Sequence, residues 1–305
     1  MGKQNRRSFL ATVGAFGTAF ASRGMAMKPI ERVGKTSLRV SLAGYSLRQY
    51  LQRPKGIPGS IDLLTFADYA ADLGLDAVEP TSYYFPSQDP ADFAHKLKRR
   101  CHILGLDVSG GAIRNNFTLS PGDALDQCFK DVEKWIDVYA ELGAPVIRVF
   151  GGKPPKGIST EQAVKNCIVN LEKACEMAGK RGIMLGLENH DFLCDVSPML
   201  EIVEGVQSPW FGVNFDSGNF HSNDPYSDLE KIAPYTVNAQ IKAEIRGRDG
   251  KREEADFDRI VSILLNAGYR GYAVLEYEAA VDPYEGIPTY VEKLRRAIVQ
   301  ESRAM

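Results

Sequence analysis

Short apolar runs alternate with longer amphipathic segments along most of this chain. Eight runs have the length and apolar content of buried strands: Val40–Tyr45, Leu75–Glu79, Leu106–Gly111, Pro145–Phe150, Ile183–Glu188, Phe211–Asp216, Val237–Lys242 and Tyr272–Tyr277. Between them, apolar residues recur at the 3.6-residue spacing of helices, as in Ile61–Leu73, Ala124–Leu142, Glu161–Arg181, Phe257–Ala267 and Tyr284–Ile298. The alternation predicts parallel βαβ units.

Glycine stands where several of these helices should stop, just before the next strand. The positions are Gly74, Gly105, Gly143, Gly182 and Gly268, and we expect them in the left-handed conformation that ends a helix. A unit of about 30 residues, counted eight times, fits a closed (β/α)8 TIM barrel better than an open sheet. No G-x-G-x-x-G motif follows the first strand, which argues against a dinucleotide-binding fold.

Composition narrows the class of protein further. The chain has 305 residues, of which 44% are hydrophobic and 25% charged, as in a soluble globular protein with room for one large barrel. Its net charge is −2 and its basic residues are interleaved with acidic ones, so we expect no nucleic-acid partner. The five cysteines form no C-x-x-C pair, and buried free thiols are the simplest expectation for them.

The first residues have the pattern of an export signal. NRRSFL at residues 5–10 precedes a mild apolar run too short to span a bilayer, and Ala19-Phe20-Ala21 offers a small-residue cleavage site. We therefore predict a twin-arginine signal at 1–21, a linker at 22–35 and a single barrel domain at 36–305. This predicts a periplasmic protein with no stable membrane insertion after processing. The alternative is a chance arginine pair before an apolar helix.

Polar side chains end four consecutive predicted strands. These are Glu188, Asp216, Gln240 and Glu276. The carboxyl ends of barrel strands meet at one face, where active sites are built. Three carboxylates crowded there would repel one another, and a divalent cation would relieve the repulsion. The sequence therefore predicts a metal site, although each residue alone could serve as a helix cap or an ion-pair partner.

These motifs resemble the xylose-isomerase-like barrels, specifically the sugar phosphate isomerase/epimerase group with its ketose epimerases and inosose dehydratases. The resemblance extends from about residue 38 to the C-terminus. It rests on GLDAVE ending at Glu79, on LENH around Glu188, on FDSGNF around Asp216 and on LE at Glu276. In that family, Glu, Asp, His and Glu from strands five to eight hold the metal. The resemblance implies that Glu188 and Glu276 also move protons beside a substrate carbonyl.

Two positions depart from the family pattern. The seventh strand usually has His-x-Lys-Asp, whereas this chain has Gln240-Ile241-Lys242-Ala243. An all-oxygen site favours Mn²⁺ or Mg²⁺ over Zn²⁺ or Co²⁺. Asn219 stands where ketose epimerases often have a substrate-binding histidine, so the identity of the substrate does not transfer from that subgroup.

Further side chains should face the same cavity. Lys242 lies two residues beyond Gln240 on the same strand face, where a lysine could neutralise a developing enolate or pair with a glutamate. Arg148 shares the interior face of its strand and needs a buried partner, for which Glu79 is a candidate. The other predicted substrate-binding residues are His190, Asn219, His221, Arg246 and Tyr45.

The sequence thus predicts a divalent-metal-dependent isomerase or epimerase of a small sugar or keto-sugar, acting by proton abstraction next to a carbonyl. The same residues could perform an elimination, as a lyase or dehydratase. A phosphodiesterase with several zinc ions would need more metal-binding histidines than the strand ends provide. A non-catalytic sugar-binding protein with a structural metal is the alternative of a different class. The sequence does not determine the oligomeric state, and a homo-oligomer is one possibility.

Overall fold

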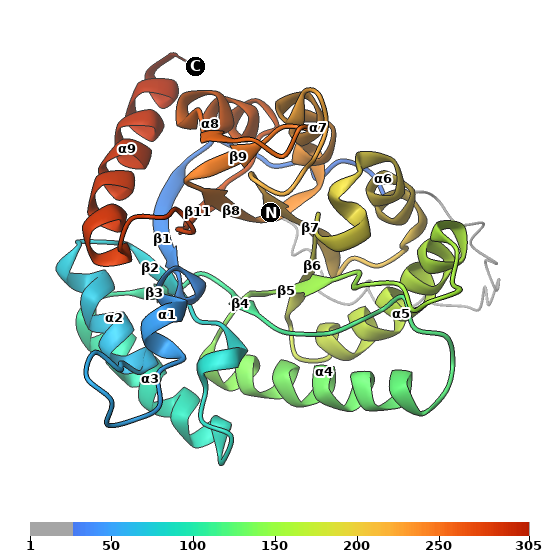
Figure 1. Ribbon diagram of the computed structural model, residues 1–305, viewed down its shortest axis with the longest axis horizontal. Coiled ribbons are helices and arrows are strands. Elements are labelled where there is room, and N and C mark those ends of the chain that lie inside the picture. The colour runs from blue at the N-terminus through green and yellow to red at the C-terminus, as the bar shows by residue number, and fades with distance from the viewer. Residues whose placement is uncertain (1–26, 305) are drawn as a thin grey trace, which may run out of the picture.

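A ring of parallel strands forms the centre of the computed structural model, which describes residues 27–304 (Figure 1). The strands are β1 (Leu38–Ala43), β2 (Ala77–Glu79), β3 (Asp107–Val108), β4 (Gly111–Ala112), β5 (Val146–Phe150), β6 (Met184–Glu188), β7 (Phe211–Asp216), β8 (Thr236–Lys242) and β11 (Gly271–Glu276). Their order around the sheet is β3-β2-β1-β11-β8-β7-β6-β5-β4, and all pairings are parallel. The predicted TIM barrel is therefore confirmed.

The third barrel position is divided between two short strands. β3 pairs only with β2, and β4 pairs only with β5. A parallel bridge between Thr81 and Ala112 joins the two edges of the sheet. The single strand predicted at Leu106–Gly111 is thus broken after Val108 and resumes at Gly111, and the bridge nearly closes the ring.

Helices surround the strands on the outside of the ring (Figure 1). They are α1 (Arg48–Leu51), α2 (Leu63–Asp72), α3 (Pro90–Leu104), α4 (Asp123–Leu142), α5 (Thr160–Gly179), α6 (Val196–Gly205), α7 (Pro225–Ile232), α8 (Phe257–Asn266) and α9 (Pro283–Ala304). Gly74, Gly105, Gly143, Gly182 and Gly268 all have φ between 62° and 92°, as expected for glycines that end helices. Aspartate or serine side chains cap the N-termini of several helices, for example Asp62 on α2 and Ser159 on α5.

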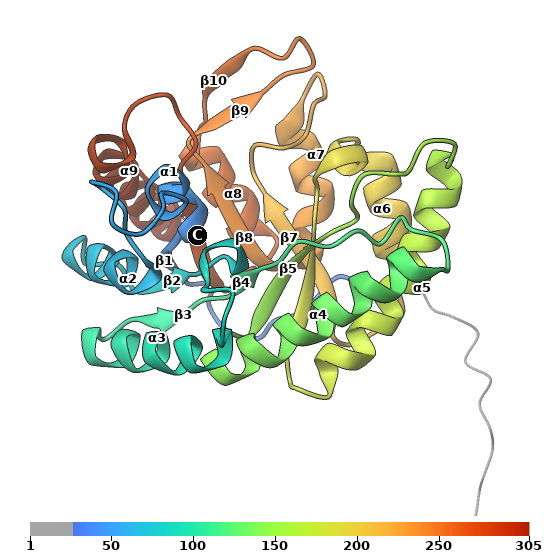
Figure 2. The ribbon, with the colours of Figure 1, turned by 60° about the horizontal axis from the view of Figure 1, so that its bottom comes forward.

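A two-stranded hairpin rises from the end of β8 and stands above the body of the barrel (Figure 2). It consists of β9 (Glu244–Arg246) and β10 (Arg252–Glu254), which pair antiparallel. Short 3-10 helices follow other strands, among them Gly44–Leu47 after β1 and Asp191–Cys194 after β6. These segments form the wall around the carboxyl ends of the strands.

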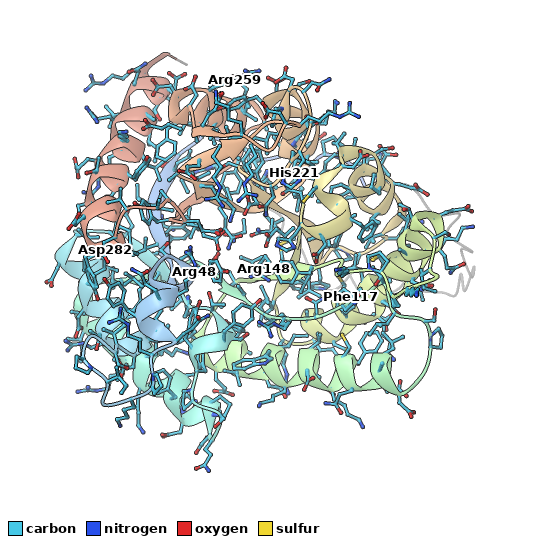
Figure 3. All side chains as sticks on the ribbon, in the orientation of Figure 1. Arg48, Phe117, Arg148, His221, Arg259 and Asp282 are labelled. Carbon is cyan, nitrogen blue, oxygen red and sulfur yellow. The ribbon has the colours of Figure 1, made fainter. Side chains whose placement is uncertain are left out.

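The largest apolar core lies between the strands and the helices. Large buried side chains there include Phe66, Tyr139 and Phe211. The inside of the ring is partly polar, because Glu79, Arg148, Asn214, Asn238 and Gln240 are all buried. Arg148 lies near the centre of the molecule in Figure 3. Such groups need internal partners, and those partners determine how the polar side chains inside the ring are arranged.

Residues 27–35, the described part of the predicted linker, lie against the barrel without regular structure of their own. Ile30 N–H donates to the Pro234 carbonyl at 2.9 Å, and Arg32 donates to the Thr236 carbonyl at 2.5 Å. The predicted signal at residues 1–21 lies outside the described residues. Within residues 27–304, none of the helices combines the length and apolar character required to cross a membrane. All five cysteines are free thiols.

Candidate active site

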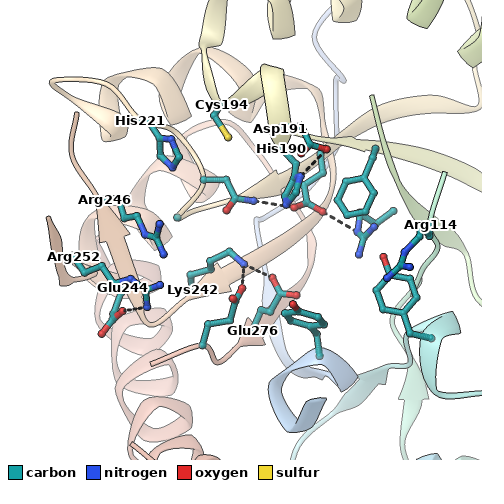
Figure 4. Close-up of a pocket in the computed structure, with 18 of the residues that line it drawn as sticks. Arg114, His190, Asp191, Cys194, His221, Lys242, Glu244, Arg246, Arg252 and Glu276 are labelled. Atoms are coloured by element: carbon teal, nitrogen blue, oxygen red, sulfur yellow. Dashed lines mark hydrogen bonds and ion pairs between the residues drawn. The ribbon is translucent and has the colours of Figure 1, made fainter. Parts of the chain in front are cut away.

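A cavity of about 620 Å³ opens at the carboxyl ends of the strands (Figure 4). Nearly all of the predicted site residues line it: Tyr45, Arg148, Glu188, His190, Asn219, His221, Lys242, Arg246 and Glu276. Asp216 lies at its floor and is fully buried, in contact with Lys242. Glu79 and Gln240 are buried and do not line the cavity.

Lys242 forms the centre of the cavity floor. Its Nζ lies 2.6 Å from Glu276 Oε2 and 3.2 Å from Asp216 Oδ2, and it also donates to Glu278 Oε1. Lys242, Asp216, Glu276 and Glu278 are called the ammonium cluster below. Burial lowers the pKa of Lys242, but the surrounding carboxylates outweigh burial and hold that pKa well above its usual value. Lys242 is therefore a fixed positive charge.

The carboxylates of this floor differ in electrostatic environment. Burial raises the pKa of Asp216 well above its ordinary value, against the opposing effect of Lys242. Burial also opposes ionisation of Glu278, yet the contact with Lys242 keeps the pKa of Glu278 below its ordinary value. Burial thus makes Asp216 harder to ionise, whereas the contact with Lys242 makes Glu278 easier to ionise.

Glu188 is held by partners on both of its oxygens. Arg148 Nε lies 2.8 Å from Oε2, and Asn219 Nδ2 donates to Oε1 at 2.9 Å. Burial raises the pKa of Glu188 to about 7, with Arg148 acting in the opposite direction. The predicted partner of Arg148 was Glu79, and the structure instead pairs Arg148 with Glu188. The reason is that Glu79 is saturated by other donors.

Those donors belong to a second polar group beneath the cavity, the amide network of Glu79, Asn214, Asn238 and Gln240. Gln240 Nε2 donates to Glu79 Oε1 at 2.5 Å, and Asn238 Nδ2 donates to Glu79 Oε2 at 2.6 Å. Asn214 Nδ2 donates to Gln240 Oε1 at 2.7 Å. Burial raises the pKa of Glu79 to about 7. The side-chain oxygen of Gln240, the predicted metal ligand, is therefore engaged inside the protein.

Aromatic and cationic side chains form the walls. His190 packs against the ring of Phe150 with centroids 4.6 Å apart, and its Nδ1 lies 3.2 Å from Asp191. His221 and Arg246 face the cavity from the loop after β7 and from β9 (Figure 4). Burial, and then the nearby Arg246 and His190, lower the pKa of His221. The guanidinium carbon of Arg48 lies over the ring of Tyr45, 5.0 Å from the ring centroid.

Several lining residues were not predicted from the sequence. Glu278 lies two residues beyond Glu276, so strand alternation could have indicated it. Arg114 follows β4 and stacks over Tyr83 at 4.8 Å, but nothing in its local sequence distinguishes it from a surface arginine. Glu244 and Arg252 pair at 3.2 Å across the β9–β10 hairpin, which has no apolar alternation to reveal it.

The four predicted ligands do not fit a divalent metal in this arrangement. Glu188 and Gln240 have their oxygens occupied, and an oxygen of Glu276 contacts Lys242. Asp216 Oδ2 is buried without a hydrogen-bond donor and faces the ammonium of Lys242. Among residues 27–304, His, Cys, Asp and Glu side chains form no group of three or more arranged to hold a metal ion.

Comparison with known proteins agrees with this fold. Hydroxypyruvate isomerase of Escherichia coli is 24% identical over 246 residues, covering 75% of this chain and 93% of that protein. The solved structure of 3-keto-D-glucoside 4-epimerase from E. coli has a TM-score of 0.64 at 16% identity, covering 85% of this chain and 100% of the other. D-psicose 3-epimerase from Clostridium cellulolyticum, solved with D-tagatose, has a TM-score of 0.65 at 14% identity, with coverage of 88% and 99%.

At these identities the two solved structures bear on the fold alone. The family is shown by a separate comparison: the model of the xylose isomerase-like TIM barrels matches residues 67–297, well over half of the sequence. This chain belongs to the xylose isomerase-like TIM barrel family.

Proposed function

We propose that this protein is an isomerase or epimerase of a small keto-sugar or hydroxy-keto acid, which moves a proton at a carbon next to a carbonyl. One observation supports this most directly: two carboxylates, Glu188 and Glu276, border a sugar-sized cavity with the ammonium of Lys242 on its floor. Glu188 ends β6 and Glu276 ends β11, with β7 and β8 between them in the ring. A substrate above this arc has a proton acceptor on each flank.

The proposed chemistry follows from these charges. One carboxylate takes the proton from the carbon, and the electron pair of that bond moves to the carbonyl oxygen. Lys242 donates a hydrogen bond to the resulting enolate oxygen, because its positive charge is fixed by its neighbours. The other glutamate, in its carboxylic acid form, returns a proton to carbon, so that the two side chains end with exchanged protonation states. The proton goes to the opposite face of the same carbon for epimerisation. For isomerisation it goes to the former carbonyl carbon, and the hydroxyl proton of the neighbouring carbon leaves as the new carbonyl forms and passes to the enolate oxygen.

The walls would orient the substrate. His190, His221 and Asn219 offer hydrogen bonds to hydroxyl groups, and Tyr45 and Phe150 add aromatic surface to the lining. Arg114 and Arg246 line the cavity, and within residues 27–304 no ion-pair partner is observed for either. This favours substrates with an acidic or oxygen-rich end. Hydroxypyruvate, ketoses and 3-keto-glucosides, named for the similar proteins, form a suitable panel.

Deuterium exchange tests this proposal. The protein is incubated with each compound in deuterated water, and the substrate and product carbons are analysed by NMR. Deuterium beside the carbonyl is expected with at least one compound, and Glu276→Gln should abolish it. Glu201→Gln, which changes an exposed residue of α6, is the matched control. Bound sugar without exchange for any compound would contradict the proposal and favour a non-catalytic binding protein.

The same experiment separates isomerisation from elimination, since loss of water gives a product of different mass.

We also propose that the chain is exported through the twin-arginine route, based on Arg6-Arg7 and the apolar run that follows. Changing both arginines to lysine should keep the protein out of the periplasmic fraction. Unchanged distribution between fractions would contradict export by this route.

A further inference from the structure

The ammonium of Lys242 lies among the carboxylates that the sequence assigned to a metal. Its side chain is 12% exposed, and three carboxylates contact its Nζ: Asp216 at 3.2 Å, Glu276 at 2.6 Å and Glu278. Two of these three are predicted metal ligands. A lysine that paired with only one glutamate could turn aside, whereas this one is held from β7, from β11 and from the residues after β11.

The remaining predicted ligands are directed to other partners. Both oxygens of Glu188 are engaged, one by Arg148 and one by Asn219. The Gln240 oxygen accepts from Asn214 and its amide group donates to Glu79, so turning this side chain would break two buried hydrogen bonds. A cation held by the floor must therefore rely on Asp216 and Glu276, the same groups that hold Lys242.

The backbone of the neighbouring loop is shaped around the lysine stem. A Cβ added at Gly218 would lie 2.7 Å from the Glu244 carbonyl oxygen, 2.8 Å from Lys242 Cδ and 3.0 Å from Lys242 Cβ, closer than side-chain atoms normally approach. Gly218 has no positive φ, so glycine is needed here for lack of space for a side chain and not for its backbone conformation. Ser217 Oγ accepts the Lys242 N–H at 2.8 Å and fixes the start of the side chain. The loop after β7 thus accommodates the inward position of Lys242.

We propose that the Lys242 ammonium is the resident cation of this active site and takes the place that a divalent metal holds in related barrels. It would stabilise the enolate oxygen formed by proton abstraction, so that proton transfer proceeds without a metal. A divalent ion on Asp216 and Glu276 would lie beside the ammonium, and the two positive charges would repel strongly in this buried position. The inference rests on the proposed function for its catalytic part, while the exclusion of metal stands on the contacts alone.

Metal binding can be measured without any substrate. The protein is dialysed against EDTA and then exposed to Mn²⁺, and thermal melting and elemental analysis report binding. For the wild-type chain we expect no rise in melting temperature and far less than one ion per chain. Lys242→Met vacates the carboxylates with a side chain of similar length, so Mn²⁺ should raise its melting temperature. Lys180→Met, at the exposed residue directly after α5, should behave as wild type.

Exchange then tests the catalytic part. Wild-type exchange should be the same with and without EDTA, and Lys242→Met should lose about a hundredfold or more, as when one oxyanion donor is removed. If Lys242→Met fails to fold, Gly218→Ala serves instead, because the added methyl crowds both the lysine stem and the Glu244 carbonyl beside it and should lower exchange in a folded chain. Wild-type exchange in Gly218→Ala would contradict the role of the stem position.

The outcomes separate the two proposals. One Mn²⁺ bound per wild-type chain, with exchange lost in EDTA and restored by Mn²⁺, would overturn the replacement of metal by Lys242. No exchange with any substrate, together with Mn²⁺ binding by Lys242→Met and not by wild type, would support the replacement while contradicting the proposed function.

Discussion

Strand β8 contributes to two buried polar groups whose carboxyl side chains are stabilised in different ways. In the amide network, burial raises the pKa of Glu79, the carboxamides of Gln240 and Asn238 donate to both of its oxygens, and solvent is excluded. In the ammonium cluster, two residues further along β8, carboxylates are balanced by Lys242 and one side is open to the cavity. Buried carboxylates on adjacent strands are thus a poor guide to chemistry on their own. Access and the kind of partner distinguish a structural group from a reactive one.

The largest effect on stability should come from opening the amide network. Gln240→Leu removes one donor and one acceptor from a site that is 1% exposed, leaving Glu79 and Asn214 short of a partner. Because each unsatisfied buried group costs about 1–3 kcal/mol, we expect a loss of about 4 kcal/mol in the free energy of unfolding, measured in urea.

Ile241→Val is the matched control for that substitution. Ile241 is the next residue of β8, is fully buried and faces the apolar core, so removing one methylene should cost only about 1 kcal/mol. A loss for Gln240→Leu no greater than that of the control would mean that the network contributes little, and the contrast between the two groups would disappear.

A pH dependence should distinguish Glu79 from an ordinary carboxylate. Its pKa is about 7 in the folded chain against 4.5 in the reference state, so the folded chain retains a proton that the unfolded chain releases. The associated stability is fully present below about pH 4.5 and is lost as the pH rises through about 7. Relative to Glu79→Gln, which does not titrate, the wild type should lose roughly 3 kcal/mol over this interval.

Urea unfolding of both chains at several pH values measures that difference, in which the other titrating groups largely cancel. Glu201→Gln, which changes an exposed residue of α6, is the matched control. A flat difference for Glu79→Gln would show that the carboxyl group is ionised, and that the network is charged like the ammonium cluster.

The smallest effect should come from the rim of the ammonium cluster. The Glu278 side chain is 35% exposed, and Lys242 keeps Asp216 and Glu276 when Glu278→Gln removes one charge. Because solvent screens this pair, the stability should change by less than about 1 kcal/mol. Urea unfolding checks this expectation, and a loss equal to that of Gln240→Leu would contradict the division into a structural and an open group.

Local sequence patterns predicted much of the frame. The strand Phe211–Asp216 was predicted with the bounds that the structure has, since its apolar run is flanked by clear turn signals. The broken third strand was not foreseen. A Cβ at Gly110 would lie 3.2 Å from Glu79 Oε2, so the break lets the backbone pass close to a buried carboxylate. The β9–β10 hairpin escaped prediction because most of its side chains are charged or exposed.

For the site, alternation along β8 predicted that Gln240 and Lys242 share one face. It could not predict which partner each would choose. The partners of Gln240 include Glu79, 161 positions earlier in the chain. Whether its amide binds Glu79 or a metal therefore depends on contacts that form only when the barrel closes. A ligand inferred from the end of one strand is therefore less secure than the fold inferred from all of them.

The segment at residues 27–33 has a consequence for the order of folding. It bonds to Pro234 and Thr236 through Ile30 and Arg32, and Arg270 donates to the Val33 carbonyl at 2.5 Å, a sequence separation of 237. Contacts so distant along the chain form late, after the intervening loops have been ordered. Residues 27–33 can therefore bind to the barrel only after nearly the whole chain has been synthesised. Their attachment is a late step that requires the last strands of the barrel to be in place.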